Sequence, residues 1–362
     1  MCLGTPGVIG LLAFMLALLP ASGAHAQWAP CSGTTGLNMQ SLSSRGTFAF
    51  SGGATGAYRS TNGAVSFAPS NSGNDASGPT RGFANDASYI YTCTSQGVFR
   101  SANDGATYVA KSQGLGSLLG HGNHQVQGKL FHVGPAGVDR SENQGDSWAA
   151  AGLAGTDVRC ITSIDSTLFV GTNGSGIYKS TSWGATWTAA NNGLTSTTFR
   201  AIEASAGTLF AGGQVGTGVF RSLDQGLSWT LLGGGLPGGS YRGFASDGRV
   251  IVAGSFGAGV YYSVDNGDHW TAINLGLTDL TIFDLEIHQG TGMAATNTQG
   301  VFRFAMSNLI DLDGDDCIGA SDLSILLSAW GPCATCAADF NGDGAVDSTD
   351  LSTMLAYWGA CG

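Results

Sequence analysis

SLDQGLSW, at residues 222–229, is one of six related octapeptides in this chain. The first serines of the six copies follow one another at intervals of 39 to 42 residues. A fixed period of this length is typical of repeat proteins, in which each repeat is one small unit that packs against its neighbours. The period therefore predicts a propeller or a solenoid. The other copies are SVDNGDHW at 263–270, SENQGDSW at 141–148, STSWGATW at 180–187, SANDGATY at 101–108 and STNGAVSF at 60–67.

Each octapeptide is part of a longer repeated unit. A five-residue word such as GVFRS (97–101) leads into it, and a β-rich run such as TLFVGT (167–172) precedes that word. A Gly-Leu pair and another alternating run follow most copies. Each unit thus holds four strand-like segments, which is the content of one propeller blade. The Arg or Lys of the five-residue word recurs in nearly every unit, which favours a structural role for it.

A seventh word, GVFRF at 300–304, has no octapeptide after it, so its unit lacks an outermost strand. The segment that starts at Gln27 and Trp28 can supply this strand, because the Gly-Leu marker follows it at 36–37. We therefore predict an all-β, seven-bladed β-propeller over residues 27–306, closed by an N-terminal strand. Closure of this kind removes the open sheet edge. An open solenoid with a separate cap at each end is the alternative.

The N-terminal residues indicate export. An apolar run at 8–20 and the small-x-small sequence Ala24-His25-Ala26 are typical of a secretory signal peptide, which we assign to residues 1–26. No other segment approaches the length of a membrane span. We expect a secreted protein, extracellular or at the cell surface.

The net charge of −11 belongs to the C-terminal tail. From residue 307 onward there are nine Asp and no Lys or Arg, which leaves 16 acidic and 14 basic residues in the rest of the chain. Nothing in this distribution indicates a nucleic-acid partner. Four tail cysteines are predicted to form disulfides with three possible pairings, and the CxxC pair among them has a redox or metal site as its alternative. These cysteines are Cys317, Cys333, Cys336 and Cys361.

Residues 307–362 are predicted to form a small α-helical domain with paired EF-hand-like loops. Each loop is followed by a similar helical run, DLSILLSAWG or DLSTMLAYWG. Oxygen ligands at these spacings predict two bound calcium ions, whereas a solvated acidic linker would not explain the duplication. The ligands are Asp311, Asp313, Asp315, Asp322 and the carbonyl of Cys317 in the first loop, and Asp339, Asn341, Asp343, Asp347, Asp350 and the carbonyl of Ala345 in the second.

The paired loops, over residues 309–359, resemble a type I dockerin. The resemblance implies a cohesin-like or other cell-surface protein as the partner of the tail, and Ser348-Thr349 match the pair that dockerins use for cohesin recognition. The first loop departs from the pattern with Asp316 at position 6 and Gly319 at position 9. The helices also lack the basic residues of cohesin-binding dockerins. A different attachment or self-association role therefore stays open.

The octapeptide S-x-D-x-G-x-x-W resembles the Asp-box, or bacterial neuraminidase repeat, and the copies at 222 and 263 match it in full. We interpret it as structural: the Ser and Asp or Asn side chains bond the turn backbone, Gly accepts a positive φ, and the aromatic ring packs beneath the turn. The resemblance implies a hairpin on the rim, away from the central channel.

Asp-box proteins include sialidases, xyloglucanase-like hydrolases and a photosystem II assembly factor. The Phe/Tyr-Arg-Ile-Pro sequence of sialidases is absent here, and xyloglucanases pair two propellers where this chain has one. The assembly factor, which is similar in blade count, works by binding.

Four arginines are the best candidates for ligand binding. Arg159, Arg200 and Arg242 each lie six residues after the Leu of the Gly-Leu marker, near the start of an inner strand, and Arg81 is equivalent. Guanidinium groups at one channel mouth can hold a carboxylate or sulfate through forked hydrogen bonds. The alternative is that each arginine links its blade to the next one.

Two further groups of residues have candidate roles. Glu203 and Glu286 are the best carboxylate pair for glycoside hydrolysis, which usually needs two such groups, and they are equally explained as partners of the arginines. The histidines of one unit suggest a metal site more weakly; they are His121, His124 and His132.

These features favour a secreted, non-enzymatic binding or structural propeller that recognises an anionic glycan or a protein and is tethered through a calcium-dependent tail. The alternative is a glycoside hydrolase, sialidase-like or xyloglucanase-like, that acts in extracellular polysaccharide degradation.

Overall fold

The computed structural model describes residues 28–74, 78–214, 216–315, 317–333 and 336–360. The predicted signal peptide lies outside these residues. None of the helices in the described ranges is long and apolar enough to cross a membrane.

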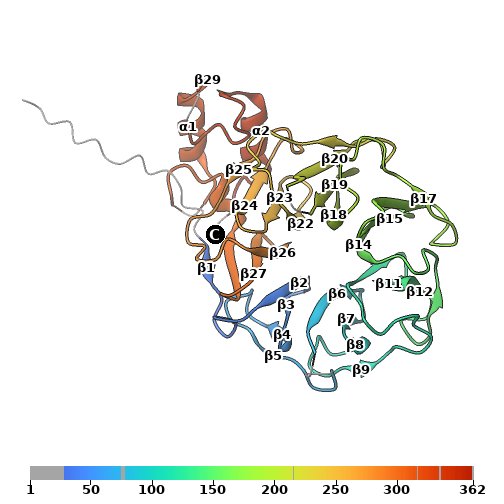
Figure 1. Cartoon of the computed structure of the whole chain (residues 1–362). Coiled ribbons are helices and arrows are strands. Elements are labelled where there is room, and N and C mark those ends of the chain that lie inside the picture. Colours follow the sequence, from blue (N-terminus) through green and yellow to red (C-terminus); the bar gives the residue numbers. More distant parts are fainter. Residues whose placement is uncertain (1–27, 75–77, 215, 316, 334–335, 361–362) are drawn as a thin grey trace, which may run out of the picture.

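Seven four-stranded antiparallel sheets surround a central channel (Figure 1). In the first six blades the strands follow chain order from the channel outward. Blade 1 has β2 (Met39–Arg45), β3 (Phe48–Gly53), β4 (Gly56–Ser60) and β5 (Ala68–Pro69); blade 2 has β6 (Thr80–Asn85), β7 (Ile90–Thr94), β8 (Gly97–Ser101) and β9 (Val109–Ala110); blade 3 has β10 (Gly122–Val126), β11 (Lys129–Gly134), β12 (Gly137–Ser141) and β13 (Ala149–Ala150).

The remaining blades continue the same plan. Blade 4 has β14 (Val158–Ile164), β15 (Thr167–Thr172), β16 (Ile177–Ser180) and β17 (Thr188–Ala189); blade 5 has β18 (Phe199–Ser205), β19 (Thr208–Gly213), β20 (Val219–Ser222) and β21 (Thr230–Leu231); blade 6 has β22 (Tyr241–Ser246), β23 (Ile251–Ser255), β24 (Gly259–Ser263) and β25 (Thr271–Ala272). Blade 7 has β26 (Ile282–His288), β27 (Thr291–Thr296), β28 (Val301–Ala305) and, from the other end of the chain, β1 (Ala29–Pro30).

The N-terminal strand closes the ring, as the sequence predicts. Strand β1 pairs with β28 in the register Ala29 opposite Arg303. Trp28, just before β1, is 2% exposed, and its ring centroid lies 4.4 Å from that of Phe304. The chain is therefore a closed seven-bladed propeller, and the open solenoid is excluded.

The octapeptides join the third and fourth strands of blades 1 to 6, and their polar side chains hold the turn. In the copy at 222–229, the amide of Gly226 donates to Ser222 Oγ at 2.8 Å and the amide of Ser228 to Asp224 Oδ1 at 2.9 Å. The same pair of bonds is present in the other five copies, because Asn or Ser accepts where Asp is missing. The first copy keeps the left-handed turn with Ala64 in place of glycine, at φ 62°. The octapeptide is thus a structural turn.

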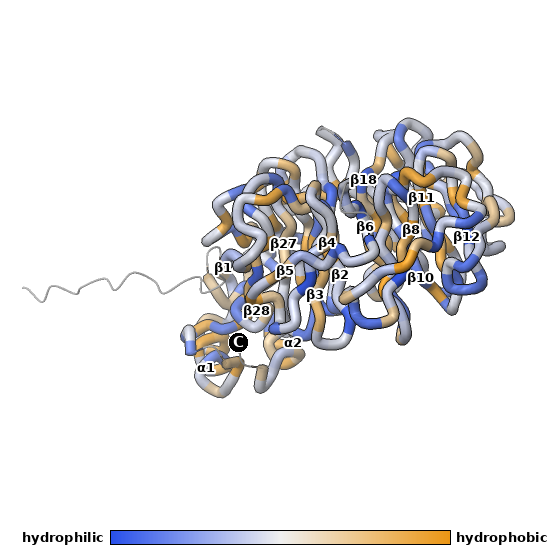
Figure 2. Tube along the Cα trace, turned by 90° about the horizontal axis from the view of Figure 1, so that it is seen from below, coloured by the Kyte–Doolittle hydropathy of each residue, from blue (hydrophilic) through white to orange (hydrophobic). Residues whose placement is uncertain are grey.

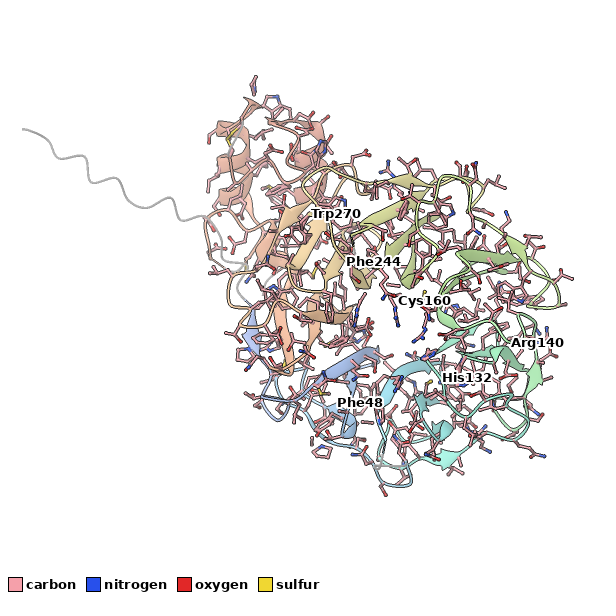
Figure 3. The ribbon with its side chains drawn as sticks, viewed as in Figure 1. Phe48, His132, Arg140, Cys160, Phe244 and Trp270 are labelled. Atoms are coloured by element: carbon pink, nitrogen blue, oxygen red, sulfur yellow. A yellow bond between two sulfur atoms is a disulfide. The ribbon has the colours of Figure 1, made fainter. Side chains whose placement is uncertain are left out.

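Two sets of bonds connect octapeptides to the blade before them: the first set involves the copies of blades 2 to 6, and the second those of blades 3 to 5. The Arg or Lys of the five-residue word donates to the carbonyl of the fourth octapeptide residue in the next blade, as Arg140 does to Trp183 at 2.8 Å. Figure 3 shows Arg140 at the outer edge of the ring. The other members of this set are Arg59 with Asp104, Arg100 with Gln144, Lys179 with Gln225 and Arg221 with Asn266.

The second set consists of tryptophan indoles that donate backward to the outer edge of the preceding blade. Trp148, Trp187 and Trp229 donate to Lys111, Ala151 and Ala190 at 2.7 to 2.9 Å. Trp28 makes the same bond to Ile273 of blade 6, at 2.6 Å. Trp28 thus takes the place of the octapeptide tryptophan that blade 7 lacks.

The tail follows blade 7 without a long linker. It contains η1 (Met306–Leu309), α1 (Ala320–Ser328), β29 (Gly331–Pro332), β30 (Ala345–Val346) and α2 (Ser348–Ala356). The two helices lie at the edge of the ring and toward one of its faces (Figure 2). Cys333 and Cys336 form a disulfide, as predicted for the tail cysteines. Cys317 is also disulfide-bonded, and Cys361 lies outside the described residues.

Candidate functional site

Most inner strands carry a β-bulge near their start. The bulges of blades 2, 4, 5 and 6 leave one residue unpaired, and in each case this residue is an arginine: Arg81, Arg159, Arg200 and Arg242. Gln40 of blade 1 and Phe283 of blade 7 occupy the same bulged position. A bulge bends the strand and redirects a side chain, which is why bulges are common beside binding sites.

The redirected side chains meet around one cavity of about 320 Å³ at the end of the channel where the inner strands begin. It is lined by all six bulged residues and by His121, which precedes β10 of blade 3. In Figure 3, nitrogen-bearing side chains reach into the opening of the ring near Cys160. We call this ring of side chains the mouth; it consists of Gln40, Arg81, His121, Arg159, Arg200, Arg242 and Phe283.

The positive charge of the mouth is only partly balanced. Asp157 is paired with Arg159 and also contacts His121 Nε2 at 3.1 Å. In the described part of the chain, Arg81, Arg200 and Arg242 form no ion pair. Burial, together with the nearby arginines, lowers the pKa of both Arg200 and Arg242 below the usual arginine value. The mouth therefore holds more cations than anions.

The arginines are positioned mainly by uncharged neighbours. Arg200 Nε donates to Gln214 Oε1 at 3.1 Å. The Arg242 guanidinium lies 3.7 Å from the ring centroid of Phe256 and 5.3 Å from that of Phe283. The buried Nε atoms of Arg81, Arg159 and Arg242 have no hydrogen-bond partner within the described residues. Of the four, Arg242 contacts the next blade, whereas the partners of Arg159 and Arg200 belong to their own blades.

A group of carboxyls lies deeper in the ring. Glu203 is three residues beyond Arg200 on β18, roughly 10 Å along the strand. Burial, with Glu286 and Asp284 nearby, raises its pKa to about 8. Burial also raises the pKa of Asp284 and of Glu286 to about 7. Neither glutamate forms an ion pair with an arginine in the described part of the chain.

Asp284 and Glu286 both connect blade 7 to blade 1. Asp284 Oδ2 accepts the amide of Leu42 at 2.8 Å, and Glu286 accepts the hydroxyl of Ser44. These two acids therefore contribute to ring closure. Glu203, which like Asp284 lines the mouth cavity, makes no such contact between blades within the described residues.

Replacing Glu203 by glutamine is expected to stabilise the propeller at alkaline pH. The raised pKa means that the native state favours the protonated acid, so the stability it contributes is present below pH 4.5 and is lost as the pH rises through about 8. Glutamine cannot ionise, and the variant should gain on the order of 4 kcal/mol at pH 8.5 and little at pH 4.5. Urea unfolding at both pH values measures this. Glu142→Gln, at a surface site, is the control, and equal pH profiles for wild type and Glu203→Gln would contradict the assignment.

The three histidines do not converge on a metal. His124 bonds to Ser163 at 2.9 Å and His132 to Asn123 at 2.8 Å, while His121 faces Asp157. Burial lowers the pKa of all three to about 4, so they are neutral at pH 7. Within the described residues, the group that can hold a metal is in the tail. The weaker metal interpretation of the histidines has no support from this geometry.

The tail loops fit a hard cation. In the first loop, oxygens of Asp311, Asp313, Asp315 and Asp322 lie within 4.8 Å of one another, and such a set of oxygen donors is what calcium prefers. The carboxylate of Asp322 also accepts backbone amides of its own loop, from Leu312 and Gly319, both at 2.7 Å.

The second loop has the same design. Asp350 accepts amides from Phe340 at 2.8 Å and Asp347 at 2.9 Å. Asp339 accepts the amide of Gly342 at 2.8 Å. Asp347 Oδ1 accepts the amide of Thr349 at 2.7 Å and caps α2. Asn341 and Asp343 complete the oxygen-bearing side chains of this loop, and the carbonyls of Cys317 and Ala345 remain predicted ligands.

Comparison with known proteins identifies the tail. Residues 309–358 match the family model of the dockerin type I domain. This chain therefore carries a dockerin domain after a seven-bladed propeller. Dockerin domains bind calcium and cohesins. No curated protein matches the sequence.

Solved structures share the propeller fold. The GH74 xyloglucanase from Xanthomonas campestris superposes with a TM-score of 0.61 at 17% identity, over 78% of this chain and 54% of that chain. YCF48 bound to D1 peptide gives 0.62 at 13% identity, over 77% and 96%. YCF48 from Cyanidioschyzon merolae gives 0.62 at 12% identity, over 78% and 99%. This chain spans about half of the xyloglucanase, and identities this low establish the fold alone.

The sequence predicts four of the seven mouth residues, the arginines. It gives no role to Gln40 and Phe283, and it groups His121 with the other histidines. Asp157 and Phe256, which contact mouth residues, are not predicted either. A signal was present, because the seven mouth residues follow one another at intervals of 38 to 42 residues. The bulge that turns these positions into the channel has no sequence pattern of its own.

Proposed function

We propose that this chain is an exported, non-enzymatic binding propeller of the Asp-box type. Its ring, residues 27–306, would bind an anionic glycan or an acidic protein segment at the mouth. Its tail, residues 307–362, would tether the ring to a cohesin or another cell-surface protein in a calcium-dependent way, after removal of the signal peptide at 1–26.

The observation that carries this proposal is the unbalanced charge of the mouth. Three guanidiniums that form no ion pair within the described residues face one cavity. A guanidinium presents its donors as a planar fork that matches carboxylate and sulfate groups. Burying such cations without a counter-charge is unfavourable, and an anionic ligand supplies the missing charge.

The tail leaves the mouth open. Arg242 lies at the start of β22, whereas Asp247, which follows the end of that strand, accepts a hydrogen bond from Tyr357 of the tail at 2.9 Å. Five residues of strand separate these two positions by roughly 16 Å. The ligand and the tail therefore meet opposite faces of the ring, so both can bind at once.

A binding screen tests the proposal. The full chain is exposed to heparin-derived oligosaccharides, oligogalacturonates, acidic peptides and neutral xyloglucan oligosaccharides at two salt concentrations. We expect binding to at least one anionic class and weaker binding at higher salt, because screening reduces charge attraction. Binding to the neutral oligosaccharides alone, or binding indifferent to salt, would contradict the proposal.

The tail is expected to bind two calcium ions. Titration calorimetry should find two sites in the full chain and one site after Asp343→Asn, because this change removes a carboxylate from the second loop only. Asp165→Asn, in an exposed turn of blade 4, is the matched control and should leave both sites intact. If calorimetry finds no heat of binding at millimolar calcium, this part of the proposal is wrong.

A glycoside hydrolase is the second candidate function, and Glu203 is the observation that favours it. Its pKa near 8 keeps the acid protonated at neutral pH, as a general acid requires. The similarity of fold to a GH74 xyloglucanase is compatible with this role. Hydrolysis of sialosides or plant glucans that disappears in Glu203→Gln would support the enzyme, with Glu286 or Asp284 as the second carboxylate.

A further inference from the structure

We propose that the dockerin domain is also a clamp on the propeller, through which calcium bound at the second loop stabilises blades 6 and 7. This proposal is independent of what the mouth binds. It depends on the position of the tail, on the buried residues that the tail and the ring share, and on one difference between the two tail repeats.

The tail sits where the regular blade-to-blade connection is interrupted. In blades 1 to 5, a basic residue on the third strand donates to the octapeptide of the next blade. Blade 7 has no octapeptide, and Tyr262 takes the place of the basic residue in blade 6. Tyr262 is 7% exposed and belongs to the hydrophobic cluster that contains the tail. The tail thus covers the side chain that a seventh octapeptide would otherwise meet.

One hydrophobic cluster runs from the ring into the tail without a break. Its ring members come from blades 6 and 7 and include Trp28, the residue that closes the ring. The connection is short and fixed, since the amide of Met306 donates to Gly290 of blade 7 at 2.7 Å. The fully buried members contributed by the tail are Ile310, Ile318, Leu326, Phe340, Val346 and Met354.

The two tail repeats differ where the tail meets the ring. The helical words DLSILLSAWG and DLSTMLAYWG place Ala329 and Tyr357 at equivalent positions. The Tyr357 hydroxyl donates to Asp247 at 2.9 Å, and the Arg249 guanidinium lies 5.3 Å from the centroid of its ring. Tyr357 is 6% exposed, whereas the neighbouring Trp358 is 47% exposed. The second repeat therefore carries the contact with blade 6.

The second loop couples calcium to this contact. Phe340 is 1% exposed in the shared cluster and lies between Asp339 and Asn341, two of the predicted ligands. Its amide bonds to Asp350, a third ligand, at 2.8 Å. Without a cation the carboxylates of the loop repel one another, and a loop that opens withdraws Phe340 from the cluster. Because only the native loop binds the ion, calcium stabilises every contact that depends on that loop.

Hydrogen exchange measured by mass spectrometry on the full chain tests the clamp. On changing from calcium to a chelator, we expect amides of β24, β25 and β28 to exchange about tenfold faster through local opening, with blades 2 to 4 unchanged. Asp343→Asn should reproduce this effect in the presence of calcium. Its match in the first loop, Asp315→Asn, should alter exchange within the tail alone. Changes confined to residues 309–360 after chelation would overturn the proposal.

A second pair of variants tests the contact itself. Tyr357→Ala gives the second repeat the residue that the first repeat has at this position, Ala329. It should speed exchange in β22 to β25 about tenfold, while calorimetry still finds calcium binding. Trp358→Ala removes the exposed ring of the next residue and should leave blade 6 unaffected. Equal exchange in blade 6 for both variants would contradict a clamp through Tyr357 even if the tail binds calcium normally.

Discussion

Trp28→Ala is expected to destabilise the propeller by about 3–5 kcal/mol, the usual cost of deleting a buried aromatic ring. The indole is 2% exposed, packs on Phe304 and donates to the carbonyl of Ile273. Trp28 therefore fixes the N-terminal strand to blade 6 and to blade 7 at the same time. Urea unfolding followed by circular dichroism gives the change in the free energy of unfolding.

Trp330→Ala is the matched control for this prediction. Trp330 is 49% exposed on the tail, so the same substitution there should change the free energy of unfolding by less than about 0.5 kcal/mol. If Trp28→Ala costs no more than Trp330→Ala, the N-terminal strand does not close the ring in the way described.

The second large effect is expected at the mouth. Replacing Arg200 and Arg242 together by glutamine should weaken binding of the anionic probe found in the screen by about 10²–10⁴-fold. Each lost hydrogen bond between charged groups accounts for about 1.5–3 kcal/mol. The same double variant should be at least as stable as the wild type, because the two cations form no ion pair among the described residues and their removal relieves repulsion. Calorimetry and thermal unfolding measure the two quantities.

Arg221→Gln should show the reverse behaviour. Arg221 donates to Asn266 of the next blade at 2.7 Å and contacts Asp268 at 2.8 Å, on the outer part of the ring. Its loss should cost about 1 kcal/mol of stability and leave affinity unchanged. A mouth variant that loses stability and keeps its affinity would show that the mouth arginines are structural, as Arg221 is.

The blade count could be predicted because it depends on local chemistry that repeats. Each octapeptide forms its turn with side chains of its own, a Ser and an Asp, Asn or second Ser, so six turns at a fixed period predict six blades. Trp28 and the missing seventh octapeptide then determine how the ring closes. The tail loops are equally local, because their ligands lie within 12 consecutive residues.

The site was harder to predict because it depends on contacts between distant blades. The inward direction of Gln40 and Phe283 follows from bulges, which are set by the pairing of inner strands. The raised pKa of Glu203 depends on burial and on Asp284 and Glu286, which belong to another blade. The position of the tail depends on Tyr357, whose partner Asp247 is 110 residues away in the sequence.

The central claim is that Arg81, Arg200 and Arg242, which form no ion pair within the described residues, obtain their counter-charge from a bound anion. Crystals of the full chain grown with selenate, a sulfate analogue with a strong anomalous signal, test this most directly. The account predicts an anomalous peak inside the ring, within hydrogen-bonding distance of Arg200 or Arg242, that is absent in the Arg200→Gln, Arg242→Gln double variant. Selenate bound only at outer arginines such as Arg221, with none in the mouth, would contradict the account.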